Sequence, residues 1–132
     1  MIGIDTNVLV RVLIDDHKAK KQCEQARSLL LKHEKTLITD TVLIETIWVI
    51  QRAYSIKKPQ IISTIERLLL QSTLVFDDKN TLENALETYR SHAFEFSDAL
   101  ILTKNQEKQC SLYTFDKKLS KHASATHLNQ TE

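Results

Sequence analysis

The sequence predicts an α/β fold in which short parallel strands alternate with helices. One Gly and one Pro among 132 residues are too few for a meander of tight hairpins. Short apolar or β-branched runs recur between longer segments with helical spacing. The first of these runs is nearly all apolar, which is typical of a strand buried on both faces. These observations predict a single domain with a parallel sheet and helices on both of its faces.

Six elements are predicted in the first half of the chain: a strand at 2–4, helices at 7–14 and 18–32, a strand at 36–39, and helices at 41–53 and 59–71. The first strand is the apolar run that stops at Asp5, and the helices carry apolar residues at helical spacing. Asp40 is expected to cap the helix that follows it, and Pro59 fits the first turn of the next helix.

Five elements are predicted in the second half: a strand at 73–76, helices at 79–91 and 97–109, a strand at 111–114, and a weak strand at 125–128. Each strand is a short β-rich run, and each helix shows apolar spacing close to four residues. The polar residues 129–132 are expected to form a frayed tail.

The charge balance excludes a basic field over the whole chain. Lys and Arg number 18 against 17 Asp and Glu, so a nucleic-acid surface would have to be local. Residues 17–35 and 104–121 both hold an excess of basic side chains, which solvated helix faces would explain equally well.

Cysteine use and hydropathy bear on the compartment. Cys23 and Cys110 lie far apart and form no metal-binding or disulfide motif, so we expect two buried, reduced thiols, as in a cytoplasmic protein. No apolar run approaches roughly 18 residues, and the N-terminus has no signal-peptide pattern, so no contact with a membrane is expected.

Acidic residues follow the predicted strands. Asp5, Asp40, Asp77, Asp78 and Asp116 all stand where a strand ends, and ligands of open parallel sheets bind at that edge. For any one of them, helix capping is the better explanation, and we keep it for Asp40, Asp77 and Asp78.

Glu45 and Asp98 are not explained as caps. Both are predicted on helix faces that turn inward, where an unpaired carboxylate is costly. A buried salt bridge would account for either one alone. A cluster of Asp5, Glu45, Asp98 and Asp116 would repel itself unless it held a hard cation, and oxygen ligands suit Mg²⁺ or Mn²⁺.

Four motifs carry a family resemblance: Ile-Asp5-Thr-Asn-Val-Leu, Glu45-Thr-Ile-Trp-Val, Ser97-Asp98-Ala-Leu and Tyr113-Thr-Phe-Asp116. The chain resembles the PIN-domain family over nearly its whole length, to about residue 128. The order and separation of the motifs are similar to those of bacterial VapC-type toxins, the endoribonucleases of toxin–antitoxin pairs.

The resemblance implies a three-layer α/β/α fold with about seven helices and a parallel sheet of about five strands in the order 3-2-1-4-5. It implies that Asp5 and Asp98 are the primary ligands of Mg²⁺ or Mn²⁺. Glu45 and Asp116 would complete the quartet, directly or through water. Two positions would orient the carboxylates, namely Asn7 and Thr114. Asp40 departs from the family, where Ser or Thr often caps the helix.

The implied reaction is metal-assisted hydrolysis of phosphodiester bonds in RNA, which would inhibit translation. Aromatic residues make up only 6%, too few for a platform that stacks single strands, so a folded RNA is favoured. Relatives with these motifs attack tRNA in some cases and rRNA in others, and tRNA is the target expected here before rRNA. The five histidines are expected at the surface. Four basic residues that follow the acids along the chain are candidate RNA contacts: Lys104, Lys108, Lys117 and Lys118.

The resemblance also implies partners. Toxins of this type are usually homodimers inhibited by a cognate VapB-type antitoxin, and the antitoxin can carry them into a larger assembly on promoter DNA. The antitoxin would lie in a groove, and residues around Trp48, Ile50, Tyr54 and Ile56 are candidates for its lining. Core packing explains most of these four equally well.

Two alternatives remain open. One is a non-catalytic PIN-like binding module, because an intact motif does not prove turnover. The other is a haloacid-dehalogenase-like phosphatase, which also begins with a strand followed by Asp. That class needs a second Asp two residues later, where this chain has Asn7, and it would have no use for Glu45.

Overall fold

The computed structural model describes residues 1–128, which form a mixed α/β fold with six α-helices and five short strands. These residues belong to two compact units, which we call unit 1 (Met1–Lys79) and unit 2 (Asn80–Glu132). The predicted frayed tail, 129–132, lies outside the described residues. None of the helices in the described part of the chain is both long and apolar enough to cross a membrane.

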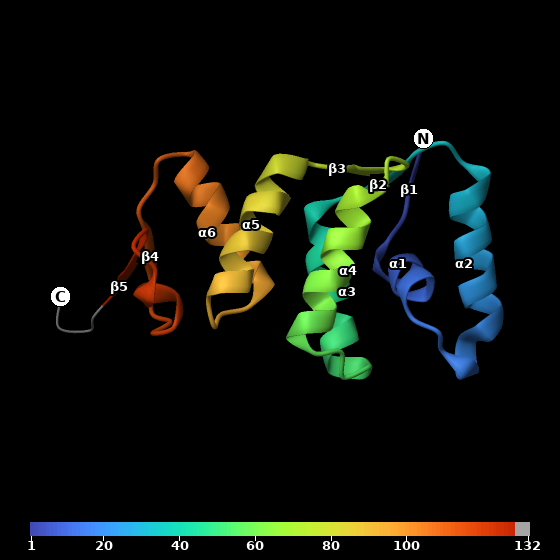
Figure 1. The fold of residues 1–132 in the computed structure, drawn as a ribbon, viewed down its shortest axis with the longest axis horizontal. Coiled ribbons are helices and arrows are strands. Elements are labelled where there is room, and N and C mark those ends of the chain that lie inside the picture. Colours follow the sequence, from blue (N-terminus) through green and yellow to red (C-terminus); the bar gives the residue numbers. More distant parts are fainter. Residues whose placement is uncertain (129–132) are drawn as a thin grey trace. The chain divides into compact units, whose positions relative to one another are not determined.

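Unit 1 contains a three-stranded parallel sheet in the order β1-β2-β3, with Ile2 opposite Thr36 and Thr36 opposite Leu74. Helix α1 packs against both α2 and α3 (Figure 1). The elements are β1 (Ile2–Gly3), α1 (Thr6–Leu13), a 3-10 turn (His17–Ala19), α2 (Lys20–Lys32), β2 (Thr36–Ile38), α3 (Asp40–Ala53), α4 (Lys58–Leu70) and β3 (Leu74–Phe76).

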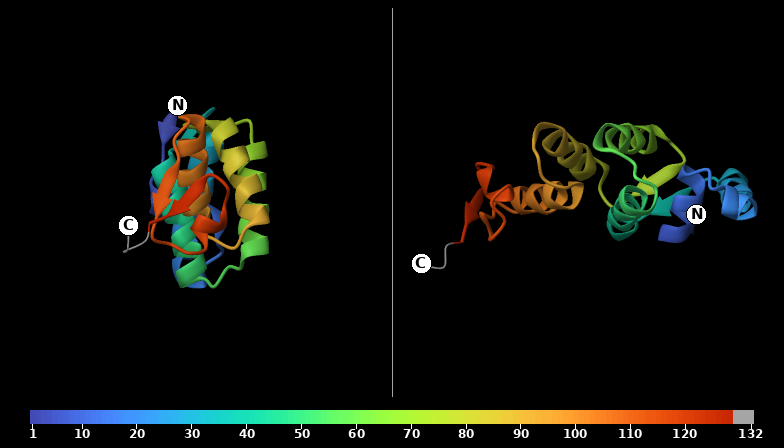
Figure 2. Two further views of the ribbon diagram at one scale, coloured as in Figure 1. Left: turned by 90° about the vertical axis from the view of Figure 1, so that its left-hand side faces the viewer. Right: turned by 90° about the horizontal axis from the view of Figure 1, so that it is seen from below.

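Unit 2 contains two helices followed by a pair of parallel strands. Strands β4 and β5 lie side by side, with Leu112 opposite Ala125 (Figure 2). The elements are α5 (Lys79–Ser91), α6 (Phe96–Glu107), β4 (Leu112–Thr114), a second 3-10 turn (Leu119–Lys121) and β5 (Ala125–His127).

Every predicted strand and helix is present, with bounds that shift by a few residues at most. The orders β1-β2-β3 and β4-β5 agree with the two halves of the predicted order, whereas pairing of β1 with β4 stays a prediction. The first strand is not buried on both faces, because Ile2 is half-buried, Gly3 is exposed and only Ile4 is buried. The resemblance implied about seven helices, and residues 1–128 contain six α-helices and two 3-10 turns.

Helix ends are formed almost without glycine. Thr39, rather than Asp40, caps α3, since its hydroxyl accepts a hydrogen bond from the Val42 N–H at 3.4 Å. A helix is often followed by a Gly in the left-handed conformation. Here Ser55 adopts that conformation after α3, with a φ of 54°, and Gln109 adopts it after α6, with a φ of 58°. The chain therefore accepts some backbone strain where Gly would cost little.

Each unit has its own buried side chains. In unit 2 the rings of Tyr89 and Phe96 pack edge to face with their centroids 5.6 Å apart. In unit 1 the largest buried side chains come from three helices (α1, α3 and α4) and β2: Leu9, Ile38, Leu43, Ile50, Ile61 and Ile65. Cys23 is buried as expected, but Cys110 is exposed; both are free thiols.

A polar network ties the end of α1 to the end of α3. The Tyr54 hydroxyl donates to the Asp16 carboxylate at 2.8 Å and accepts from the Arg11 guanidinium at 3.1 Å. Arg11 also donates to Gln22 at 2.9 Å. The hydrogen bond from Tyr54, the backbone N–H of Lys18 and the charge of Arg11 lower the pKa of Asp16.

Tyr54→Phe is expected to make unit 1 less sensitive to acid. A lowered pKa in the folded state gives stability that is present above the unfolded pKa and is lost as pH falls through the folded value. The wild type should therefore lose stability below about pH 4, and the variant should lose less, from a lower starting value. Urea denaturation from pH 7 to pH 3 measures this. Parallel stability curves for the two proteins would contradict the role assigned to Asp16.

Candidate functional site

Asp5 stands at the junction of β1 and α1 in unit 1. It is the N-cap of α1, and its Oδ1 accepts a hydrogen bond from the Val8 N–H at 3.1 Å. The side chain is exposed. The capping explanation is therefore correct for Asp5, and it holds the carboxylate in one orientation at the carboxyl end of the first strand.

Glu45 lies in the second turn of α3, also in unit 1. The prediction that it faces inward is wrong, because Glu45 is exposed. The buried stripe of α3 consists of Leu43, Thr46, Ile47 and Ile50. Thr46 is fully buried, and its hydroxyl has no hydrogen-bond partner within residues 1–128, so the polar side chain that the core of α3 tolerates is Thr46 and not Glu45.

Asp98 is the third residue of α6 in unit 2 and is half-buried. Its Oδ2 accepts a hydrogen bond from the Glu95 N–H at 3.3 Å, so it does contribute to a helix cap, contrary to expectation. Burial raises the pKa of Asp98, and the negative charges of Asp116 and Glu95 raise it further. The ionised form of Asp98 is therefore less favourable in the protein than it is in water.

Asp116 begins the turn after β4. Its Oδ1 accepts hydrogen bonds from the N–H groups of Lys118 and Leu119 at 2.8 and 3.1 Å. The hydroxyl of Thr114 accepts from the Asp116 N–H at 2.9 Å, so Thr114 holds the backbone of this carboxylate. Asn7, the other predicted supporting residue, is exposed and forms no side-chain hydrogen bond within residues 1–128.

The four predicted acids divide equally between the units. Asp5 and Glu45 belong to unit 1, whereas Asp98 and Asp116 belong to unit 2 and lie close enough for their charges to interact. Among residues 1–128, none of the four forms an ion pair, and no group of three or more His, Cys, Asp or Glu side chains is placed to hold a metal ion. The gathering of all four therefore stays a prediction.

The donor set fits the implied metal. All four side chains offer carboxylate oxygens, the ligands of Mg²⁺ and Mn²⁺, and a cation beside Asp98 would remove the repulsion that raises its pKa. Glu95 is a neighbouring acid that the sequence argument missed. Its signal was available: an acidic residue three positions before Asp98 matches the spacing of a capping box.

Asp40 and Asp77 come shortly after the carboxyl ends of β2 and β3, the two other strands of the sheet in unit 1. The Asp40 N–H donates to Oδ2 of Asp77 at 2.8 Å, so Asp77 satisfies an N–H at the start of α3. Thr39 therefore takes the capping role that the sequence suggested for Asp40.

The candidate RNA contacts are exposed side chains of unit 2, the unit that holds Asp98 and Asp116: Lys104, Lys108, Lys117 and Lys118.

Two of the five histidines, expected at the surface, are half-buried and contact other rings. The His92 ring stacks on Phe94 at 5.1 Å and lies 4.9 Å from the His122 ring. Burial, and then the charge of His92, lower the pKa of His122.

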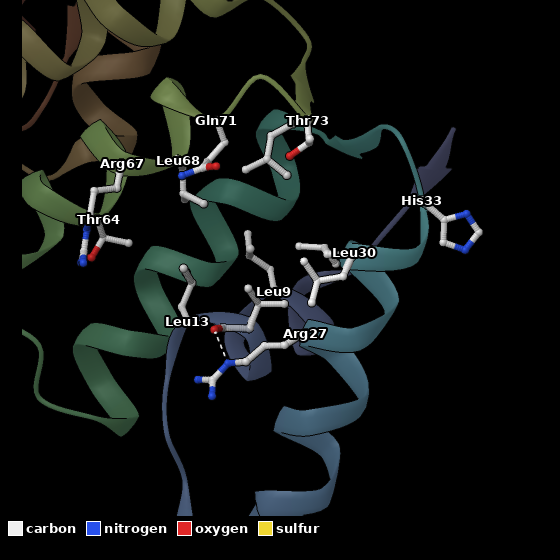
Figure 3. Close-up of a pocket in the computed structure, with 13 residues that line it drawn as sticks. Leu9, Leu13, Arg27, Leu30, His33, Thr64, Arg67, Leu68, Gln71 and Thr73 are labelled. Atoms are coloured by element: carbon white, nitrogen blue, oxygen red, sulfur yellow. Dashed lines mark hydrogen bonds between the residues drawn. The ribbon is translucent and has the colours of Figure 1, made fainter.

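An apolar groove of about 560 Å³ lies in unit 1, bounded by α1, α2 and α4. Leu9, Leu13, Leu30 and Leu68 point into it, and Arg27 donates to the Val12 carbonyl at its lower edge at 3.0 Å (Figure 3). None of Trp48, Ile50, Tyr54 and Ile56 borders this groove, so an antitoxin surface around those four residues stays a prediction.

Comparison with known proteins gives a family and a likeness to solved structures. The PIN domain family model matches residues 2–125. The chain is similar to the crystal structure of VapC20 of Mycobacterium tuberculosis, described as a toxin that cleaves the sarcin–ricin loop. The identity is 16% and the TM-score 0.45, over 92% of this chain and 94% of that one. No curated protein sequence matches the chain.

Proposed function

Because this chain belongs to the PIN-domain family, a family of nucleases, we propose that it is a metal-dependent endoribonuclease and the toxin of a toxin–antitoxin pair. It would hydrolyse phosphodiester bonds in structured RNA, tRNA before rRNA, and so inhibit translation. It would act in the cytoplasm as a homodimer. The phosphatase alternative has no support from the family match, and the non-catalytic module is the alternative that experiment must exclude.

One observation carries the proposal. Asp98 is half-buried beside the charge of Asp116, and neither forms an ion pair with a Lys or Arg within residues 1–128. Two carboxylates left in this state make the protein less stable than neutral side chains would, unless a cation joins them. Family members place Asp5 and Glu45 in the same site, and both are exposed and without ion pairs in unit 1.

Each side chain then has a defined task. Asp5 and Asp116 use one oxygen to accept backbone N–H groups, which fixes the carboxylates for an ion. Glu45, without a cap or an ion pair, can hold the ion directly or through water. A bound Mg²⁺ or Mn²⁺ would supply a Lewis acid that lowers the pKa of water and neutralises phosphate charge. Lys117 and Lys118 would draw the RNA backbone towards Asp116.

The purified chain is expected to cut total tRNA or rRNA with Mg²⁺ or Mn²⁺ and to stop in EDTA. Asp5→Asn should reduce cleavage by about 100-fold or more. In the absence of RNA, divalent metal should raise the melting temperature of the wild type and not of Asp5→Asn, because it binds the native state. Equal cleavage by both proteins would exclude the nuclease. RNA binding without cleavage would favour the binding module.

The apolar groove of unit 1 is the proposed seat of the VapB-type antitoxin. Its leucines suit the apolar face of a helix, and Arg67 at its border suits an acidic residue of that helix, whereas Arg27 already pairs with Asp15 at 2.7 Å. Such an antitoxin would also link the toxin to promoter DNA.

Leu31→Asp is expected to weaken antitoxin binding by about 10-fold or more, because it places a charge in the apolar border of the groove. Leu31 is 88% exposed, so the fold should tolerate the change. Leu70→Asp is the matched control, since Leu70 is 80% exposed and lies outside the groove. Titration calorimetry with the cognate antitoxin measures both. Equal affinities for the two variants would place the antitoxin elsewhere.

A further inference from the structure

Helix α3 carries an exposed tryptophan that the catalytic proposal does not use. Trp48 is 55% exposed and is the one tryptophan of the chain. The guanidinium carbon of Arg52 lies 4.8 Å from the centroid of its ring. Glu45, Trp48 and Arg52 follow at intervals of three and four residues, so they line one face of the helix. The proposed catalytic acid and the aromatic ring are therefore one helical turn apart.

Packing does not account for this pair. The buried stripe of α3 runs through Leu43, Thr46, Ile47 and Ile50, and Trp48 lies outside it. A cation–π contact at an exposed site stabilises a protein only weakly. That gain is small for a side chain that leaves half of its large apolar surface in water. The arrangement holds the ring rigid and leaves part of it open to a ligand.

The charge around the ring selects the ligand class. After Trp48 the chain carries three basic residues up to position 65, Arg52, Lys57 and Lys58, and no Asp or Glu, while Glu45 lies on the other side of the ring along α3. Arg52 forms no ion pair within residues 1–128. An open aromatic face beside an unneutralised guanidinium offers stacking to a base and charge-assisted hydrogen bonds to a phosphate. An apolar protein surface would use the ring but would leave the guanidinium without an anion.

We propose that Trp48 and Arg52 form a recognition site for one unpaired nucleotide of the RNA substrate. The base stacks on the open face of the indole, and Arg52 binds the adjoining phosphate, so the strand runs along the face of α3 that carries Glu45. The proposal rests on the ribonuclease function and names a residue pair that selects its substrate. The low aromatic content argues against a platform for several bases, and one tryptophan serves one base.

The single tryptophan makes the test direct. Binding is followed by its fluorescence in EDTA, so that no RNA is cut, with a short single-stranded oligoadenylate as the probe. The oligonucleotide should quench the emission saturably, whereas an abasic backbone of the same length should quench little. In a fluorescence-anisotropy assay with labelled RNA, Trp48→Leu should weaken binding by about 10-fold and Arg52→Gln by less. Leu70→Ala and Arg90→Gln, exposed residues of other helices, serve as controls and should bind like the wild type.

The outcomes separate the two proposals. If Trp48→Leu binds and cuts RNA like the wild type, the nucleotide site is wrong and the nuclease stands. If RNA quenches Trp48 but the wild type never cuts it, the nucleotide site stands and the nuclease fails. If the emission changes with protein concentration alone and RNA leaves it unchanged, this face of α3 contacts a second copy of the chain, and the nucleotide site is overturned. A folded Trp48→Phe variant should retain most of the affinity, because the smaller ring still stacks.

Discussion

Asp98→Asn is expected to reduce RNA cleavage by about 100-fold or more while leaving the folded protein at least as stable as before. The amide keeps an oxygen that accepts the hydrogen bond from the Glu95 N–H, but it carries no charge. The costs of burying the charge and of repulsion from Asp116 and Glu95 both disappear. A group that destabilises the protein and is needed for activity is typical of a functional site.

Cleavage rates and melting temperatures in EDTA measure both parts of this expectation. Glu83→Gln is the matched control, because Glu83 is an exposed acid of the same unit on α5. It should leave both quantities unchanged. If Asp98→Asn lowers the melting temperature as much as it lowers the activity, then Asp98 serves the fold and the metal assignment loses its main support.

Phe96→Ala is expected to destabilise unit 2 by about 3–5 kcal/mol. Phe96 is 1% exposed, and its ring packs edge to face on Tyr89, so the substitution leaves a cavity between α5 and α6. Phe96 is also the first residue of α6, two positions before Asp98. The loss of its packing should therefore loosen the helical turn that holds that carboxylate.

Urea denaturation measures the free energy of unfolding for this variant. Phe96→Leu is the control, because it keeps an apolar side chain in the same place and should cost clearly less. Cleavage should fall in the order wild type, Leu variant, Ala variant. A loss below about 1 kcal/mol for Phe96→Ala would mean that the contact between α5 and α6 contributes little.

The periodic features of the sequence predicted the elements well, and the details near single polar residues less well. Apolar spacing located α5 with its bounds unchanged, since nothing in 79–91 competes with a helix. The start of α3 was displaced by one residue, because Thr39 and Asp40 are adjacent and both are good caps. Which of two neighbouring caps is used depends on partners from β3, and Asp77 supplies one.

The surroundings of the candidate site residues were predicted less well than the helices and strands that carry them. The apolar neighbours of Glu45 suggested that it faces inward. The buried side of α3 instead includes Thr46, the next residue, and leaves Glu45 exposed. Cys110 was expected to be buried, but the left-handed Gln109 ends α6 just before it and turns the chain outward. Such outcomes depend on a few degrees of helix rotation or one dihedral angle, which hydrophobic periodicity does not specify.

The capping bonds of Asp5 and Asp116 have a thermodynamic consequence. Each carboxylate is already held by backbone N–H groups, so little rotamer freedom remains to be lost when it takes up an ion. Fraying of the first turn of α1, or of the turn after β4, would release that restraint. The affinity for a cation is thereby coupled to the order of two short backbone segments, and heating should weaken binding before either unit unfolds.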